Sequence, residues 1–302
     1  MKFDEDALLA RMPLVLDWLG SLGIAGRSSR YGRYKKIISD FHSQYETTQD
    51  VDDAVFKELC SAYQECLDIA MVHHRFADVR GEKFLSNLAR VVTGSLTPEL
   101  RDAGPSRDYL FEMLVATIFT AAGYEVDFSS HHLTDVVARR SGNLVRIECK
   151  RLSSVKKLGV RMAEAAQQLR NSREGIIAVP SGFCFIDVSS CVLDDVGRKA
   201  ETIEAAGRAV RNSIGRFITR HYKTTIIEQL NDAIDVSYGT AFYARLPFIV
   251  KDEESQEELM SSHMAMIFRI PNVWDESMTE HAKGLTQGLD TAYATFGESF
   301  EK

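Results

Sequence analysis

The chain has 302 residues, 45% hydrophobic and 26% charged, and its formal net charge at pH 7 is −7. This composition is typical of a folded globular protein with two or three structural regions, and it excludes extended disorder and a surface coated throughout with nucleic-acid-binding groups. No apolar run reaches the roughly 18 residues of a membrane span, and the acidic beginning of the chain is unlike a secretory signal, so we expect a cytoplasmic protein without a membrane partner.

A helical N-terminal region is predicted over 1–98, because apolar residues recur at spacings of three and four. One such stripe consists of Leu8, Leu9, Met12, Leu16 and Leu19. The segment 23–32 is rich in Gly, Ser and Arg and is predicted to be a loop. We interpret this region as a helical scaffold or interaction region that carries no chemistry.

The central region, 99–197, begins where two prolines interrupt the helical pattern. Ser106 is predicted to cap a helix that ends at Gly123. Alternating or apolar runs then predict three strands, a helix and two further strands, at 124–128, 135–139, 144–150, 155–171, 176–179 and 183–188. The order helix, three strands, helix, strand predicts an α/β core with a mixed sheet.

The C-terminal region, 198–302, has a mixed α+β pattern. A helix is predicted over 198–233, followed by two strands at 236–250 and 263–270 on either side of an acidic loop at 252–258, and by a final helix. These two strands could extend the sheet of the central region.

The cysteines give no indication of a metal site. They are odd in number, and none form the C-x-x-C pairs that bind zinc: Cys60, Cys66, Cys149, Cys184 and Cys191. We expect reduced, buried thiols.

Three charged residues of the central region are predicted to share one face of a hairpin. In the segment 145–150, Val145, Ile147 and Cys149 alternate with residues that include Glu148 and Lys150. If 141–142 is the two-residue turn, Asp135 lies directly opposite Glu148. If the turn is 142–143, Asp135 faces Lys150 instead.

This grouping of side chains suggests a cation site. Directly opposed residues have β-carbons roughly 4.5–5.5 Å apart, so two carboxylates could reach one ion. Two juxtaposed carboxylates repel and require a positive partner. Oxygen ligands favour Mg²⁺ or Mn²⁺ over Zn²⁺, and an amine beside such an ion could orient or deprotonate a water molecule.

The pattern Asp135, Glu148-Cys149-Lys150, after a helix that carries Glu112, resembles the PD-(D/E)XK or restriction-endonuclease-like nucleases. The resemblance covers about 106–190, and Thr134 stands where the family name has proline. It implies that Asp135, Glu148 and the main-chain carbonyl of Cys149 bind the metal, that Lys150 acts on the water, and that Glu112 completes the site. A glutamine of the following helix, Gln167 or Gln168, would match a further family position.

The resemblance implies a metal-dependent nuclease, with DNA as the substrate and a homodimer or partner protein held through the helical flanks. A role in defence against foreign DNA follows from analogy alone. Between Arg139 and Arg173 there are ten basic and two acidic residues, a basic band that could neutralise phosphates. Its candidate nucleic-acid contacts are Arg151, Lys156, Lys157, Arg161 and Gln168.

Several alternatives stay open at this point. Glu148 and Lys150 could form a salt bridge on a solvent-facing sheet surface. The fold could belong to a catalytically inactive module that binds nucleic acid, or to a protein-interaction module. His131 and His132, shortly before Asp135, could contribute to the site, although such a pair is more often a loop feature.

Overall fold

The computed structural model describes 5–44, 53–94, 105–128, 134–172, 180–193, 199–251, 258–272, 274 and 276–296. The chain divides into two compact units that are not continuous in sequence. The first comprises Met1–Leu110, Gly197–Arg208 and Leu246–His263, and the second Phe111–Val196, Ala209–Arg245 and Met264–Lys302. Among the described residues, no helix is both long and apolar enough to cross a membrane.

The first unit is mainly helical, as its apolar periodicity predicts. Its helices are α1 (Glu5–Ser21), α2 (Arg30–Gln44), α3 (Asp53–Phe76), α4 (Glu82–Val92) and the first residues of α5 (Pro105–Ala121) and of α8 (Ile203–His221). Leu8, Met12, Leu16 and Leu19 of the predicted stripe are all buried. The predicted loop at 23–32 is too long, because α2 already begins at Arg30 and includes Gly32.

Gly32 belongs to this helix for a packing reason. A Cβ at this position would lie 2.1 Å from the carbonyl oxygen of Arg27. The glycine therefore allows the helix to lie against the preceding turn, and here it does not mark a loop.

The second unit is built around a mixed sheet. Its strands are β1 (Glu125–Asp127), β2 (Val136–Arg140), β3 (Asn143–Arg151), β4 (Gly182–Asp187) and the first part of β6 (Ser237–Lys251). β1, β2 and β3 pair antiparallel, whereas β3, β4 and β6 pair parallel. In the first unit, β5 (Lys199–Ala200) pairs with the far end of β6. β7 (Glu258–Arg269) belongs to the first unit up to His263 and to the second unit from Met264, and it also pairs with β6.

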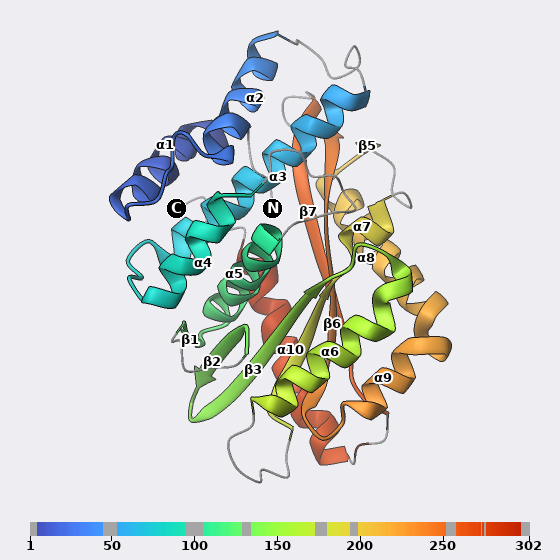
Figure 1. Cartoon of the computed structure of the whole chain (residues 1–302). Coiled ribbons are helices and arrows are strands. Elements are labelled where there is room, and N and C mark those ends of the chain that lie inside the picture. Colours follow the sequence, from blue (N-terminus) through green and yellow to red (C-terminus); the bar gives the residue numbers. More distant parts are fainter. Residues whose placement is uncertain are drawn as a thin grey trace. The chain divides into compact units, whose positions relative to one another are not determined.

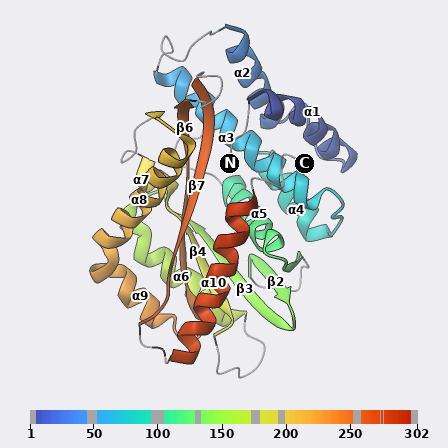
Figure 2. The same ribbon diagram turned by 180° about the vertical axis from the view of Figure 1, so that it is seen from behind.

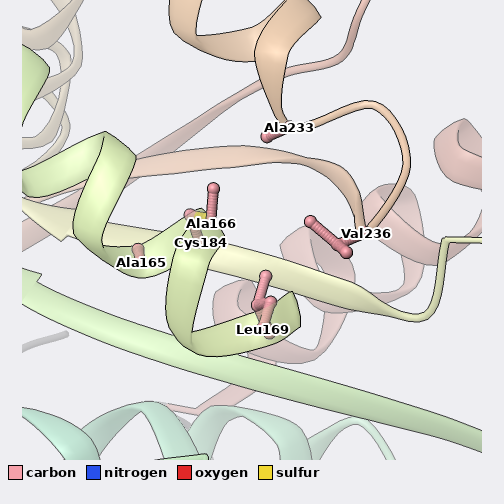
Figure 3. Packing of buried hydrophobic residues seen from close by; sticks show 6 residues of the cluster. All are labelled: Ala165, Ala166, Leu169, Cys184, Ala233 and Val236. Carbon is pink, nitrogen blue, oxygen red and sulfur yellow. The ribbon is translucent and has the colours of Figure 1, made fainter. Parts of the chain in front are cut away.

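Helices cover both faces of the strands in the second unit. α6 (Leu158–Asn171) and α9 (Ile227–Asp232) lie over one face, and α10 (Glu276–Phe296) lies over the other (Figures 1 and 2). α6 packs through a small apolar cluster with β4 and the end of α9, shown in Figure 3: Ala165, Ala166, Leu169, Cys184, Ala233 and Val236. On the opposite face, Phe119 of α5 meets Phe185 of β4 with ring centroids 5.8 Å apart.

The predicted α/β class and the order helix, three strands, helix, strand are confirmed for the residues described. Ser106 is not the predicted cap, because it is a buried residue inside α5, which begins at Pro105. The helix does end as predicted, since Gly123 has a φ of +81° and Tyr124 donates its N–H to the carbonyl of Phe119.

Other boundaries differ from the prediction. The helix expected over 198–233 consists of β5, α8 (Ile203–His221), a π-helical turn (Tyr222–Ile226) and α9. β7 begins at Glu258, earlier than expected, and a short helix α7 (Ser189–Val192) was not predicted. The strand expected at 176–179 and most of the acidic loop lie outside the described residues.

Candidate active site

The β2–β3 hairpin has the first of the two predicted registers. Arg140 pairs with Asn143 and Val136 with Ile147, which makes Ser141 and Gly142 the turn. Both turn residues have positive φ, 50° and 80°, as a two-residue hairpin turn requires. The alternative turn at 142–143 is wrong.

This register brings Asp135 beside the end of β3. A carboxylate oxygen of Asp135, Oδ2, accepts the backbone N–H of Cys149 at 2.8 Å. The Lys150 ammonium lies 3.5 Å from the same oxygen and 3.1 Å from Oε2 of Glu148. Asp135, Glu148 and Lys150 therefore form one group, as the hairpin geometry predicted.

Glu148 is the most buried member of this group. Its side chain is 0% exposed, compared with 14% for Lys150 and 19% for Asp135. Its second carboxylate oxygen, Oε1, has no hydrogen-bond partner among the described residues. Burial, and secondarily the Asp135 charge, raise the pKa of Glu148 to about 8, although Lys150 opposes the shift.

The burial of Glu148 follows from the covering of the sheet. Directly paired residues of neighbouring strands point to the same face, and Glu148 pairs with Cys184, which packs under α6. The interpretation of Glu148 and Lys150 as a solvent-facing salt bridge is therefore wrong for Glu148. The group reaches solvent through Asp135 and Lys150.

Cys149 alternates with Glu148 and so points to the other face, where it pairs with Phe185. Its backbone carbonyl, however, accepts a hydrogen bond from the Lys150 ammonium at 3.2 Å. Burial raises the pKa of the Cys149 thiol well above its ordinary value, and the charges of Asp135 and Glu112 add to this effect. Glu112 of α5 thus acts electrostatically on Cys149, and its role in a metal site stays a prediction.

Most arginines of the basic band have partners within the second unit. Arg139 pairs with Asp127, Arg151 with Asp187 and Arg170 with Asp235, while Arg161 pairs with Glu164 on its own helix. Lys156 and Lys157 are exposed at the start of the α6 segment. The band thus offers a smaller surface for phosphates than its sequence suggests, and Arg173 lies outside the described residues.

The two glutamines lie on different parts of α6. Gln167 donates to Asn171 and lines a groove of about 500 Å³ between α6 and α9, together with Val160, Arg170 and Gln229. Gln168 is half-buried. His131 and His132 lie outside the described residues.

Asp187, at the end of β4, was not predicted as a functional residue. It accepts hydrogen bonds from Arg151 Nε at 2.9 Å and from the Ser189 backbone N–H at 2.9 Å. The contact with Asp187 fixes the side chain of Arg151, the residue that follows Lys150. An acidic residue directly after the apolar run Phe183–Ile186 was the available sequence signal.

No group of three or more His, Cys, Asp or Glu side chains within the described ranges is arranged to hold a metal ion. The pair Asp135 and Glu148 is joined instead by a lysine. Comparison with known proteins gave no match among protein-family models, curated proteins or solved structures.

Proposed function

We propose that the chain is a metal-dependent nuclease with a restriction-endonuclease-like core and an active site formed by Asp135, Glu148 and Lys150. The observation that carries this proposal is the fully buried carboxylate of Glu148. One of its oxygens lacks a partner in the described part of the chain, and a second carboxylate lies beside it. Such an arrangement costs stability, and a bound cation would offset that cost.

The donor atoms fit Mg²⁺ or Mn²⁺. Carboxylate oxygens of Asp135 and Glu148 and the main-chain carbonyl of Cys149 are hard oxygen ligands, which these ions prefer. When bound, such an ion supplies charge stabilisation at a phosphoryl oxygen and lowers the pKa of bound water. Glu112 is the further candidate ligand.

The different exposure of Glu148, Asp135 and Lys150 suggests a different role for each side chain. Glu148 would hold the cation from the buried side, while Asp135 is held by the Cys149 N–H at the open side. Lys150, tethered next to Arg151 and its Asp187 partner, is positioned to orient a water molecule. A phosphodiester approaching from solvent would meet Lys150 and Asp135 first.

Nucleic acid is the proposed substrate class, and DNA is preferred by analogy with the family alone. The exposed amines of Lys156 and Lys157 follow the site directly in sequence and are suited to phosphate contacts. Arg161 and Gln168 would add to this surface if Arg161 exchanged its Glu164 partner for a phosphate.

The test is cleavage of plasmid, linear duplex and single-stranded DNA, and of RNA, in the presence of Mg²⁺ or Mn²⁺. We expect Glu148→Gln to lower the cleavage rate by about a hundredfold or more, because it removes the buried negative ligand without changing the shape of the side chain. The matched control is Glu228→Gln, an exposed residue of α9, which should cut like the wild type.

An inactive nucleic-acid-binding module is the second candidate. It is favoured by the lysine between the two carboxylates, because within the ranges that the structure describes no three acidic, histidine or cysteine side chains are arranged to hold a metal ion. Binding of DNA without cleavage under any of these metals, and unchanged in Glu148→Gln, would establish this module and refute the nuclease.

A further inference from the structure

The Lys150 ammonium has three oxygen neighbours. It lies 3.1 Å from Oε2 of Glu148, 3.2 Å from the carbonyl oxygen of Cys149 and 3.5 Å from Oδ2 of Asp135. These are atoms of the same three residues that the proposed function assigns to the metal. The amine therefore lies where their oxygens converge.

We infer that Lys150 is an internal cation that occupies the metal position in the metal-free protein and is displaced when a divalent ion binds. This inference rests on the proposed function and concerns the regulation of that site. It makes metal binding a competition between an ion from solution and the protein's own ammonium group.

The geometry of the site favours displacement of the Lys150 ammonium by the metal ion over binding of both cations at once. The ammonium contacts Oε2 of Glu148 and Oδ2 of Asp135 but leaves Oε1 of Glu148 without a partner among the described residues. A divalent ion could use oxygens of both carboxylates, but it needs oxygen distances of about 2.0–2.1 Å and repels a neighbouring ammonium. Both cations cannot use the same oxygens at once.

The lysine also has a route away from the site. Its side chain is 14% exposed, whereas Glu148 is 0% exposed, and a lysine carries its charge on a flexible four-carbon stem. The ammonium can thus move toward solvent while both carboxylates stay in place. In this displaced position it remains next to the open side of the site, where a water molecule would be oriented.

The first experiment measures Mn²⁺ affinity by titration calorimetry. Lys150→Met keeps the length of the side chain and removes the competing charge, so we expect about tenfold tighter Mn²⁺ binding than in the wild type. Lys150→Arg retains the charge and should bind Mn²⁺ no more tightly than the wild type. Lys156→Met is the matched control for the loss of one nearby positive charge, and it should leave the affinity within about twofold.

The second experiment uses the wild-type chain, so it does not depend on whether the variants fold. Acylation of lysines is followed by mass spectrometry of the peptide that contains Lys150, with and without Mn²⁺. We expect Lys150 to react several times faster when Mn²⁺ is present, whereas Lys156 and Lys157 should react at the same rate in both conditions.

The outcomes separate this inference from the proposed function. DNA cleavage by the wild type with Mn²⁺, together with an unchanged Lys150 acylation rate, would overturn displacement and leave the nuclease intact. An equal Mn²⁺ affinity in the wild type and a folded Lys150→Met variant would also overturn it. Failure of the wild type to bind Mn²⁺ and to cleave would overturn both proposals.

Discussion

Each of the two compact units buries a glutamate, and the two carboxylates differ in their ion-pair partners. In the first unit, Glu65 of α3 has a guanidinium partner on each carboxylate oxygen: Arg107 at 2.6 Å and Arg30 at 3.0 Å. In the second unit, Glu148 has one ammonium partner on one oxygen, a carboxylate neighbour, and no described partner for the other oxygen.

Under the proposed function, this difference distinguishes a structural charge at Glu65 from a functional charge at Glu148. The charge of Glu65 is compensated by side chains of α2 and α5, so the pairing joins three helices and leaves no oxygen for a ligand. In Glu148, one oxygen has an ammonium partner and the other has no described partner, which is the arrangement that the proposed cation site requires. Four predictions test this comparison.

The largest effect is expected for Glu65→Gln. The substitution leaves two buried guanidinium groups without a negative partner, which should lower the free energy of unfolding by roughly 3–5 kcal/mol. Chemical denaturation measures this loss. Glu58→Gln, at an exposed position of the same helix, should change stability by less than about 0.5 kcal/mol. An equal effect of the two substitutions would contradict a structural role of Glu65.

Metal should stabilise the wild type through Glu148. At a Mn²⁺ concentration about 100 times the dissociation constant, the free energy of unfolding is expected to rise by about 2.7 kcal/mol. Glu148→Gln should lose this gain, and Glu164→Gln should keep it. Thermal unfolding with and without Mn²⁺ gives the comparison, and an equal shift in both variants would place the ion elsewhere.

The pH dependence of stability should report the raised pKa of Glu148. The group has an ordinary pKa of 4.5 and a folded value of about 8. Between these values the unfolded chain loses a proton that the folded chain keeps, so the stability of the metal-free protein should fall as pH rises from about 4.5 to about 8 and then level off. The raised pKa of Lys150 acts only near and above its ordinary value of 10.5, outside this window.

Glu148→Gln removes this titration and tests its assignment. The variant should show a flatter stability profile and, at pH 9 without metal, exceed the wild type by roughly 1–3 kcal/mol. Denaturation at pH 5 and pH 9 measures both quantities. A variant that follows the wild-type profile would show that another group titrates.

The smallest effect is expected for Gly142→Ala in the hairpin turn. A Cβ would find open space, but the φ of +80° is unfavourable for alanine, so the substitution should cost about 1 kcal/mol. Gly215→Ala, in α8 with ordinary φ and open space, is the matched control and should stabilise slightly. A gain in stability for Gly142→Ala would contradict the turn conformation that sets the register of Asp135.

The sequence alone determined the local elements of the candidate site. Alternation of apolar and polar residues marked β3, and the segment 141–143 limited the hairpin to two registers. The structure has the one that brings Asp135 beside Glu148. The alternation and the limit to two registers follow from interactions between neighbours along the chain or across a tight turn, which a short sequence window contains.

Tertiary structure decided which charges are compensated. Glu148 is buried because α6 covers its face of the sheet. The alternation of apolar and polar residues along β3 had suggested instead that this face is open to solvent. The basic band is largely paired because Asp127, Asp187 and Asp235 come from outside it, from three different parts of the second unit. Burial and pairing depend on residues distant in sequence, so the pattern that predicted the carboxylate pair could not predict the missing partner of Glu148.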